Sequence, residues 1–298
     1  MPKLYSISEV KRILNKHGLK ANKNLGQNFL VDANILNKIV STAGILKDDV
    51  VVEIGPGLGV LTCALAKRAR RVISVEVDNK MISALKENIS SYKNVEIVHA
   101  DALKTNFDAL VKEKVFLNDK KVFSYKLVAN LPYYITSPII MHMLTNKFNL
   151  NTMVVMVQLE VAKRIVANSG NKDYGILSIA VQYYAEPKIV FKVPKTVFFP
   201  KPDVDSAVLK LSIKENPAVN VPNENLFFEV VRAAFANRRK KILNSLLYGM
   251  NLSKELIRKA LEGAEINETQ RGEDLSIIDF ARLTSCILEV LQKNESNH

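Results

Sequence analysis

Residues 50–59 read VVVEIGPGLG, and this stretch decides the fold. Its first half is a β-branched run typical of a buried strand, and its second half is a glycine loop. Residues 60–71 then carry helix-forming side chains, so the segment predicts strand, loop and helix in succession. Glycines in such a loop bring the backbone close to a ligand where side chains would obstruct it. We therefore expect a ligand at this loop.

Acidic side chains follow the next two predicted strands. Strand 72–75 ends at Glu76, which lies 21 residues after Gly55, and strand 95–98 is followed by Asp101. A carboxylate at the first place commonly holds the two hydroxyls of a ribose. One at the second place could accept a hydrogen bond from an adenine amino group. Either acid alone is often just a solvated strand end, but acids ordered along successive strand ends favour a nucleoside ligand.

The spacing of the glycines distinguishes between two nucleoside cofactors. The loop reads G-x-G-x-G, whereas the dinucleotide fingerprint places its third glycine one position later. S-adenosylmethionine (SAM) fits the pattern better than NAD, with its ribose on Glu76, its adenine by Asp101 and its methionine against the loop. We therefore expect SAM as the cofactor.

A further strand, 126–129, opens into the turn Asn130-Leu131-Pro132-Tyr133. Asn and Pro are ordinary turn residues, but this combination could also hold an adenine through hydrogen bonds to its N6 amine. An Asn side-chain oxygen and a backbone carbonyl beside the proline can accept the two N–H hydrogens and direct the nitrogen lone pair at a methyl group. Tyr133 would stack on the base.

Four motifs occur in order along the chain: KNLGQNFL at 23–30, EIGPGLG at 53–59, NLPY at 130–133 and FFPKPDVDS at 198–206. Together they resemble those of the ribosomal RNA adenine N6-dimethyltransferases, most closely the bacterial small-subunit (16S) branch. That branch modifies two neighbouring adenosines in the hairpin near the RNA 3′ end. The resemblance runs from about Lys23 to Lys241.

The resemblance also implies roles for individual residues. The segment that caps the pocket would touch SAM, Tyr133 would stack on the target base, and an aromatic from the last motif would close over its other face. Implied catalytic residues are Asn130, Pro132, Tyr133 and Phe198; implied cofactor contacts are Asn28, Leu30, Gly55, Glu76, Asp101 and Asn130.

Charge points to an anionic partner. The net charge is +12 and the pI about 9.5. Residues 1–214 hold 31 basic against 18 acidic side chains, and residues 215–298 hold 11 against 12. The second part still contains the run Arg238-Arg239-Lys240-Lys241, which we interpret as RNA-binding, although such runs are usually solvated faces. Near the N-terminus, further basic residues could flank an RNA groove: Lys11, Arg12, Lys16, Lys20 and Lys23.

Cysteine and histidine usage indicates neither disulfides nor metal. Cys63 and Cys286 lie far apart and are expected to be buried, and the four histidines share no ligand spacing. The chain begins without an apolar signal segment and has no long apolar run. We therefore expect a cytoplasmic protein without metal or membrane contact. The family resemblance implies that it acts in ribosome biogenesis, and we expect a monomer.

Periodicity predicts a two-domain α/β protein. We expect a doubly wound, Rossmann-like SAM-dependent methyltransferase domain at 1–214, with an N-terminal helical cap, and a small all-helical RNA-binding domain at 215–298. Predicted helices cover 6–17, 32–43, 174–184, 225–236, 240–247, 254–262 and 276–292. Predicted closing strands are 188–193 and 207–213.

The expected reaction is direct methyl transfer from SAM, without a covalent enzyme intermediate, to adenosines of 16S rRNA in an immature small ribosomal subunit. Three other functions stay open. The first is a 23S rRNA adenine methyltransferase of the macrolide-resistance type, which would carry the same catalytic motifs. The second is a non-catalytic RNA-binding assembly factor, disfavoured by intact Glu76, Asp101 and Asn130. The third is protein-glutamine methylation, disfavoured by the basic charge.

Overall fold

The computed structural model describes residues 5–21, 26–115 and 124–295. Lys23, Asn24 and Leu25 of the first motif lie outside these residues. Contacts divide the chain into two compact units: unit 1 comprises residues 1–162 and 186–213, and unit 2 comprises residues 163–185 and 214–298. The predicted division at residues 214 and 215 stays a prediction. The contacts differ from it in grouping residues 163–185 with the C-terminal helices.

A seven-stranded sheet forms the centre of unit 1, in the order β4-β3-β2-β5-β6-β9-β7. Strands β2 to β6 pair in parallel and β9 pairs antiparallel with β6. The bounds are β2 Val50–Ile54, β3 Arg71–Glu76, β4 Val95–His99, β5 Tyr125–Asn130, β6 Leu150–Gln158, β7 Ala185–Val193 and β9 Ser206–Ile213. Because the chain order reverses between β2 and β5, the carboxyl ends of the parallel strands form a crevice there.

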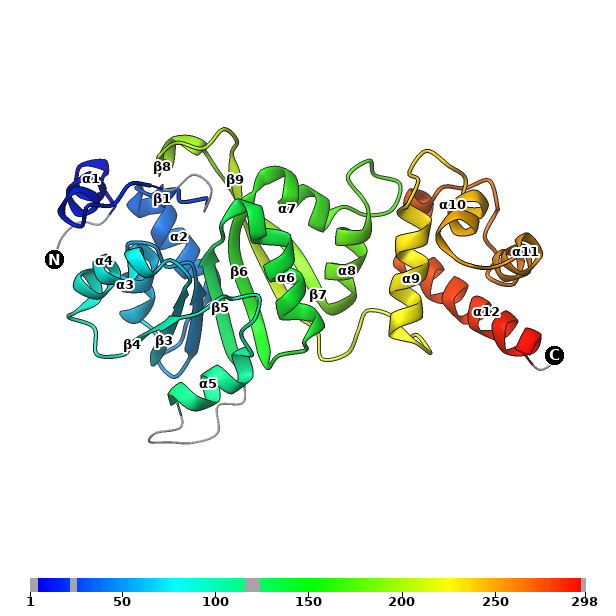
Figure 1. The fold of residues 1–298 in the computed structure, drawn as a ribbon, viewed down its shortest axis with the longest axis horizontal. Helices are drawn as coiled ribbons and strands as arrows, with labels where there is room; N and C mark the ends of the chain where they lie inside the picture. Colours follow the sequence, from blue (N-terminus) through cyan, green and yellow to red (C-terminus); the bar gives the residue numbers. More distant parts are fainter. Residues whose placement is uncertain (1–4, 22–25, 116–123, 296–298) are drawn as a thin grey trace. The chain divides into compact units, whose positions relative to one another are not determined.

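Helices lie on both sides of this sheet (Figure 1), and every residue of β2 is buried. Alternate strand residues such as Val51, Val72 and Val128 pack into one core cluster with α2 and α3. Contiguous β-branched runs are typical of parallel strands buried on both faces. The helices are α2 Ala33–Ala43, α3 Val60–Ala66, α4 Asn79–Ile89, α5 Phe107–Val115, α6 Thr136–Thr145 and α7 Leu159–Val166, the last of which continues into unit 2.

Helix α3 ends at Ala66, earlier than the sequence predicted. Asn94 donates its side-chain N–H groups to the carbonyls of Ala66 and Ala69, at 2.8 and 3.0 Å. These bonds satisfy carbonyl groups that a longer helix would have used. Arg70 and Arg71 then donate backbone N–H to Asp49, at 2.9 and 3.4 Å, and β3 starts.

The N-terminal helix α1, Ile7–Lys16, packs on the sheet domain as expected. Val10, Ile13 and Leu14 join Phe29 and Leu58 in a second core cluster of unit 1. The segment after α1 forms β1, Phe29–Leu30, which pairs antiparallel with β8, Phe198–Phe199. The first and last motifs of the sequence thus lie side by side, which the sequence alone did not predict.

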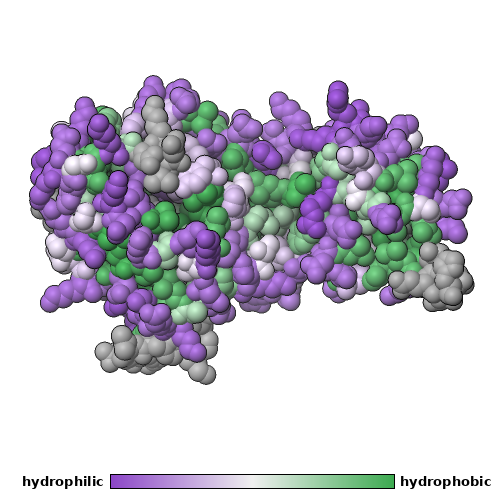
Figure 2. Space-filling model, viewed as in Figure 1, coloured by the Kyte–Doolittle hydropathy of each residue, from purple (hydrophilic) through white to green (hydrophobic). Residues whose placement is uncertain are grey.

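Unit 2 is helical. Its helices are α8 Ile176–Tyr184, α9 Glu224–Phe235, α10 Ile242–Gly249, α11 Lys254–Gly263 and α12 Ile277–Glu295. Close contact fixes α10 on α9, because a Cβ on Gly249 would lie 2.6 Å from Ala233. Hydrophilic residues cover much of the surface in Figure 2, with smaller apolar areas between them. Among the residues described, no helix combines the length and apolar character needed to cross a membrane.

Candidate active site

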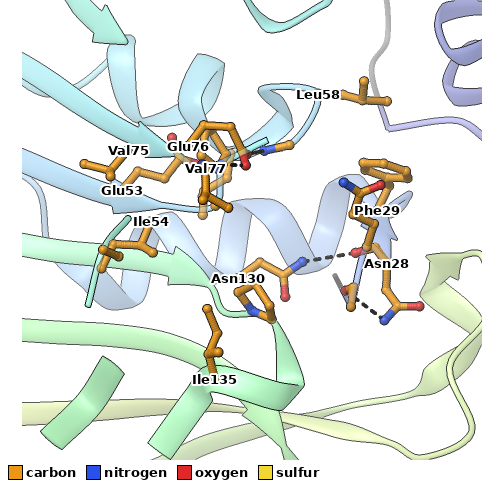
Figure 3. A pocket seen from close by; sticks show the side chains of 18 of the residues that line it. Asn28, Phe29, Glu53, Ile54, Leu58, Val75, Glu76, Val77, Asn130 and Ile135 are labelled. Atoms are coloured by element: carbon orange, nitrogen blue, oxygen red, sulfur yellow. Dashed lines mark hydrogen bonds between the residues drawn. The ribbon is translucent and has the colours of Figure 1, made fainter. Parts of the chain in front are cut away.

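A cavity of about 390 Å³ opens at the carboxyl ends of β2, β3, β4 and β5. It is lined by residues 26–30, the glycine loop after β2 with the start of α3, the end of β3, residues 100–103 after β4, the turn after β5, and Ile39 of α2. Figure 3 shows Glu76 on one side of this space and Asn28 and Asn130 on the other. Its size lies within the range of small-molecule sites.

Glycine is required in the loop after β2 for two reasons. Gly57 and Gly59 have φ angles of 55° and 85°, in the left-handed region. A Cβ on Gly59 would also lie 2.8 Å from Leu85 of α4, and one on Gly57 3.3 Å from the Phe29 ring. The loop therefore lies tightly between α4 and the N-terminal segment, with its backbone facing the cavity.

Glu76, at the end of β3, presents a carboxylate to the cavity. Oε1 accepts backbone N–H from Val77 and Asp78, at 3.0 and 2.9 Å, while Oε2 accepts only a longer bond from Gly57, at 3.3 Å. Burial raises the pKa of Glu76, and these N–H groups partly counteract it. A carboxylate has about four acceptor positions, so Oε2 is the oxygen available to a ligand hydroxyl.

Asp101 and Asn130 present the other two predicted polar groups. Asp101 Oδ1 accepts the backbone N–H of Leu103 at 3.0 Å. Asn130 Nδ2 donates to the carbonyl of Asn28 at 3.2 Å, which directs the side-chain oxygen away from Asn28 (Figure 3). None of the described residues donates a hydrogen bond to that oxygen, so it can accept one from a ligand.

The segment at residues 26–30 packs on two of the ligand-facing loops. A Cβ on Gly26 would lie 3.3 Å from the Tyr133 nitrogen. Gln27 donates to Asp78 at 3.0 Å, and Asn28 donates to the Gly26 carbonyl at 3.2 Å. The segment thereby connects the turn after β5 with the acid-bearing end of β3.

Seven of the predicted site residues line the cavity: Asn28, Leu30, Gly55, Glu76, Asp101, Asn130 and Pro132. Two predicted residues do not. The Tyr133 hydroxyl hydrogen-bonds Ser206 Oγ at 2.7 Å, and Phe198 is 3% exposed, within the core cluster that contains Leu30. The roles of Tyr133 and Phe198 toward a base stay predictions.

Tyr134 and Glu53 also line the cavity, although the sequence predicted no role for either. Tyr134 directly follows the Asn-Leu-Pro-Tyr motif. Glu53 is a buried carboxyl group that accepts from Thr62 Oγ1 at 2.6 Å and from Ser74 Oγ at 2.9 Å. Burial raises the pKa of Glu53 to about 7, against the effect of these two hydroxyl groups. An acid within a β-branched run was the available signal, because a buried strand rarely contains one.

The basic run of unit 2 is not uniform. Arg238 donates to the carbonyls of Lys172 and Tyr174, at 2.7 and 2.9 Å, and lies 3.4 Å from Glu273. These bonds hold parts of unit 2 together. Arg239, Lys240 and Lys241 are exposed and form no ion pair with another residue in the described part of the chain. Near the N-terminus, Arg12 pairs with Glu9 and Lys16 with Glu87.

Both cysteines are free, as expected, but each is partly exposed, so the prediction that they are buried is wrong. Cys63 packs at the margin of the second core cluster of unit 1, and a Cβ on Gly263 would lie 3.3 Å from Cys286 Sγ. Partial burial raises the pKa of the Cys63 thiol to about 11. In the described ranges, no group of three or more His, Cys, Asp or Glu residues could hold a metal ion.

The sheet order, the glycine loop after β2 and the acid at the end of β3 define a Rossmann-like methyltransferase. Comparison with known proteins specifies this class further. The sequence profile of the family described as "Ribosomal RNA adenine dimethylase" matches residues 18–287. The chain belongs to this family, which confirms the resemblance, the fold class and the predicted enzyme.

Two relatives are named ribosomal RNA small subunit methyltransferase A. The protein of Pelotomaculum thermopropionicum is 50% identical, over 94% of this chain and 96% of its own length. That of Geobacillus thermodenitrificans is 47% identical, over 95% and 96%. Among solved structures, a dimethyladenosine transferase from Plasmodium falciparum has a TM-score of 0.70 at 30% identity, covering 89% of this chain and 98% of its own. The 23S rRNA methyltransferase ErmE has 0.64 at 28%, covering 87% and 99%.

Proposed function

We propose that this protein transfers methyl groups from SAM to N6 of two adjacent adenosines in the 3′-terminal hairpin of 16S rRNA, within an immature small ribosomal subunit in the cytoplasm. The observation that carries the proposal is the Asn130 side-chain oxygen, which lines a cofactor-sized cavity and accepts no hydrogen bond from any described residue. Relatives at 47–50% identity carry a small-subunit name, whereas the 23S enzyme is 28% identical. These sequence identities favour small-subunit rRNA over 23S rRNA as the substrate.

The cavity residues fit SAM. Oε2 of Glu76 would accept from a ribose hydroxyl, and Asp101 would accept from the adenine amine. Gly55 would line the methionine, and Asn28 and Leu30 would cap it. SAM, when bound, supplies a methyl group on a positively charged sulfur. A Cβ on Gly55 would lie 3.5 Å from the Pro132 ring, so the glycine loop directly adjoins the turn that would hold the target.

The turn after β5 would orient the target amine. Its lone pair is delocalised into the adenine ring, and two acceptors placed at its N–H hydrogens favour a pyramidal nitrogen. Asn130 Oδ1 is one acceptor. The Pro132 carbonyl already accepts from Ile135 N at 3.2 Å and Thr136 Oγ1 at 3.0 Å. The other carbonyl beside the proline, that of Leu131, would then be the second acceptor. After transfer, the amine proton leaves to water.

RNA would be held by charge as well as by the pocket. Arg239, Lys240 and Lys241 are exposed cations suited to phosphate groups, and phosphate contacts dominate such affinity. The target adenosine must be unstacked, because N6 cannot be reached within a stacked helix.

The proposal is tested by mapping methylated adenosines after the purified protein is incubated with SAM and immature small subunits. We expect dimethylation at two neighbouring adenosines near the 3′ end of 16S rRNA. Mature large subunits and 23S rRNA serve as the comparison substrate. Methylation found on 23S rRNA instead would overturn the small-subunit assignment, and no methylation of either would overturn the catalytic one.

A further inference from the structure

Two neighbouring tyrosines follow Pro132, in a short 3-10 helix at Tyr133–Ile135. Their side chains have different surroundings. The Tyr133 hydroxyl is bound to Ser206 at the start of β9, and Tyr133 is not among the cavity residues. Tyr134 lines the cavity and has no described hydrogen-bond partner for its hydroxyl. The chain thus directs one ring toward the antiparallel end of the sheet and the other toward the pocket.

Charged neighbours locate Tyr134 within the pocket. Partial burial raises the pKa of Tyr134, and the carboxylates of Glu76 and Asp101 add to that effect. These are the two acids at the ends of β3 and β4. The Tyr134 ring therefore lies at the acidic end of the cavity, and its hydroxyl stays neutral at physiological pH.

The same end has an exposed apolar surface. Tyr134 is 52% exposed and Val77, which follows Glu76, is 51% exposed, and both line the cavity. Large apolar side chains left open beside polar acceptors are typical of a site that a flat, partly apolar ligand covers. An adenine ring between such groups would have its edge at the Asp101 carboxylate.

We propose that Tyr134 packs on the adenosine of the cofactor and is a positioning residue for SAM, distinct in role from Tyr133, whose ring is expected to stack on the target base. This inference rests on the proposed function, because it takes SAM as the ligand. The aromatic ring carries the effect and the hydroxyl contributes little. Stacking of a base on an aromatic side chain changes affinity by roughly 5- to 150-fold.

Calorimetry with two ligands tests the inference. Tyr134→Ala should lower the affinity for SAM by about tenfold or more. It should lower the affinity for methylthioadenosine, which lacks the amino-acid end, by the same factor. Tyr134→Phe should bind both within about threefold of the parent. The matched control is Tyr248→Ala, since Tyr248 is 77% exposed and belongs to unit 2. Unchanged affinity in Tyr134→Ala, or a loss confined to SAM, would overturn the inference.

A second measurement holds even if Tyr134→Ala is poorly folded. The chain contains no tryptophan, so Tyr134→Trp would introduce a single indole at this place. Methylthioadenosine and SAM should both change its fluorescence, whereas neither should change that of Tyr248→Trp. An emission unaffected by saturating ligand would refute the contact.

Kinetics separate this inference from the proposed function. With saturating SAM, Tyr134→Ala should keep a kcat near that of the parent, with a raised KM for SAM and an unchanged KM for RNA. A lowered kcat with unaltered SAM affinity would assign Tyr134 to the target base and overturn the inference. Failure of the parent protein to bind SAM would instead overturn the proposed function.

Discussion

Asn130 is the residue on which the proposed chemistry depends most. Its amide nitrogen is held by the Asn28 carbonyl, so its oxygen is already oriented before a substrate arrives. We expect Asn130→Ala to slow methyl transfer by ~10²–10³, the usual loss for one preorganised polar contact at a reacting centre. RNA affinity should change little, because phosphate contacts dominate it. Single-turnover methylation of immature small subunits measures the rate, and a rate within a few-fold of the parent would show that the amine-gripping role is wrong.

Glu76 is expected to govern cofactor affinity. Removing its carboxylate in Glu76→Ala loses charge-assisted hydrogen bonds, each worth roughly 1.5–3 kcal/mol, so SAM should bind more than tenfold more weakly. Titration calorimetry checks this, with Glu113→Ala as the control because the Glu113 side chain is 68% exposed and does not line the cavity. NAD should give no heat with the parent protein. A SAM affinity of Glu76→Ala equal to that of the parent would contradict the proposed contact between Glu76 and the ribose.

Glu53 predicts a pH dependence of stability. Its pKa is raised from 4.5 to about 7 in the folded protein, so the folded state binds the proton more tightly than the unfolded state. The resulting stability is fully present below pH 4.5 and is lost as pH rises through 7. From pH 5 to pH 8, the free energy of unfolding should fall by roughly 2–3 kcal/mol more in the parent than in Glu53→Gln. Urea unfolding at both pH values measures this, and parallel pH profiles would contradict it.

At the scale of elements, the sequence predicts best where local signals are strong. The β-branched run at Val50–Ile54 and the capping residues Ser6 and Asp32 mark their strand and helices with little ambiguity. The pairing of β1 with β8 could not be predicted, because two-residue strands show no periodicity and their partners are separated by about 170 positions. Phe198 is buried at that pairing, so its position in the core could not be predicted from the sequence either.

The candidate site likewise has features that the sequence predicts and features that it does not. Strand-end acids and the glycine loop are fixed by β3, β2 and their order in the sheet, so their convergence was predictable from parallel topology. The direction of a side chain in a tight turn was not. Tyr133 and Tyr134 are neighbours of one residue type, yet the Tyr133 hydroxyl bonds Ser206 whereas Tyr134 lines the cavity.

The basic run at residues 238–241 lies in the loop before α10, and we expect its residues to give two different mutant phenotypes. Replacing Arg239, Lys240 and Lys241 together by Ala should flatten the salt dependence of RNA binding by roughly 2 to 3 in log–log slope. Arg238→Ala should instead lower the free energy of unfolding, since it frees the carbonyls of Lys172 and Tyr174. RNA binding across salt concentrations and urea unfolding measure the two effects.

The control for that loop is Arg282→Ala, because Arg282 is a half-exposed arginine of unit 2 that already pairs with Asp279 and Glu265. Its salt slope should match that of the parent. An unchanged slope in the triple variant would indicate that the run is merely a solvated face.

At the scale of the whole molecule, charge and chemistry belong to the same unit. Counted over the sequence, unit 1 has 27 basic and 17 acidic residues, whereas unit 2 has 15 and 13. The positive potential that attracts RNA therefore arises mainly from the unit that contains the cavity. Unit 2 has a small net charge. Its contribution to the potential is local and comes from a short set of exposed cations.

Cofactor binding should accordingly stabilise one unit and not the other. All residues that line the cavity belong to unit 1. A ligand that binds only the folded state stabilises it by about 2.7 kcal/mol at 100 times its Kd. With SAM at that level, amide hydrogen exchange should slow in β2, β3 and the loops after them, while α9 to α12 exchange as without SAM. Glu76→Ala at the same SAM concentration should lose most of the protection. Equal slowing in α9 to α12 would show that the units unfold together, and that cofactor binding is coupled to the helices of unit 2.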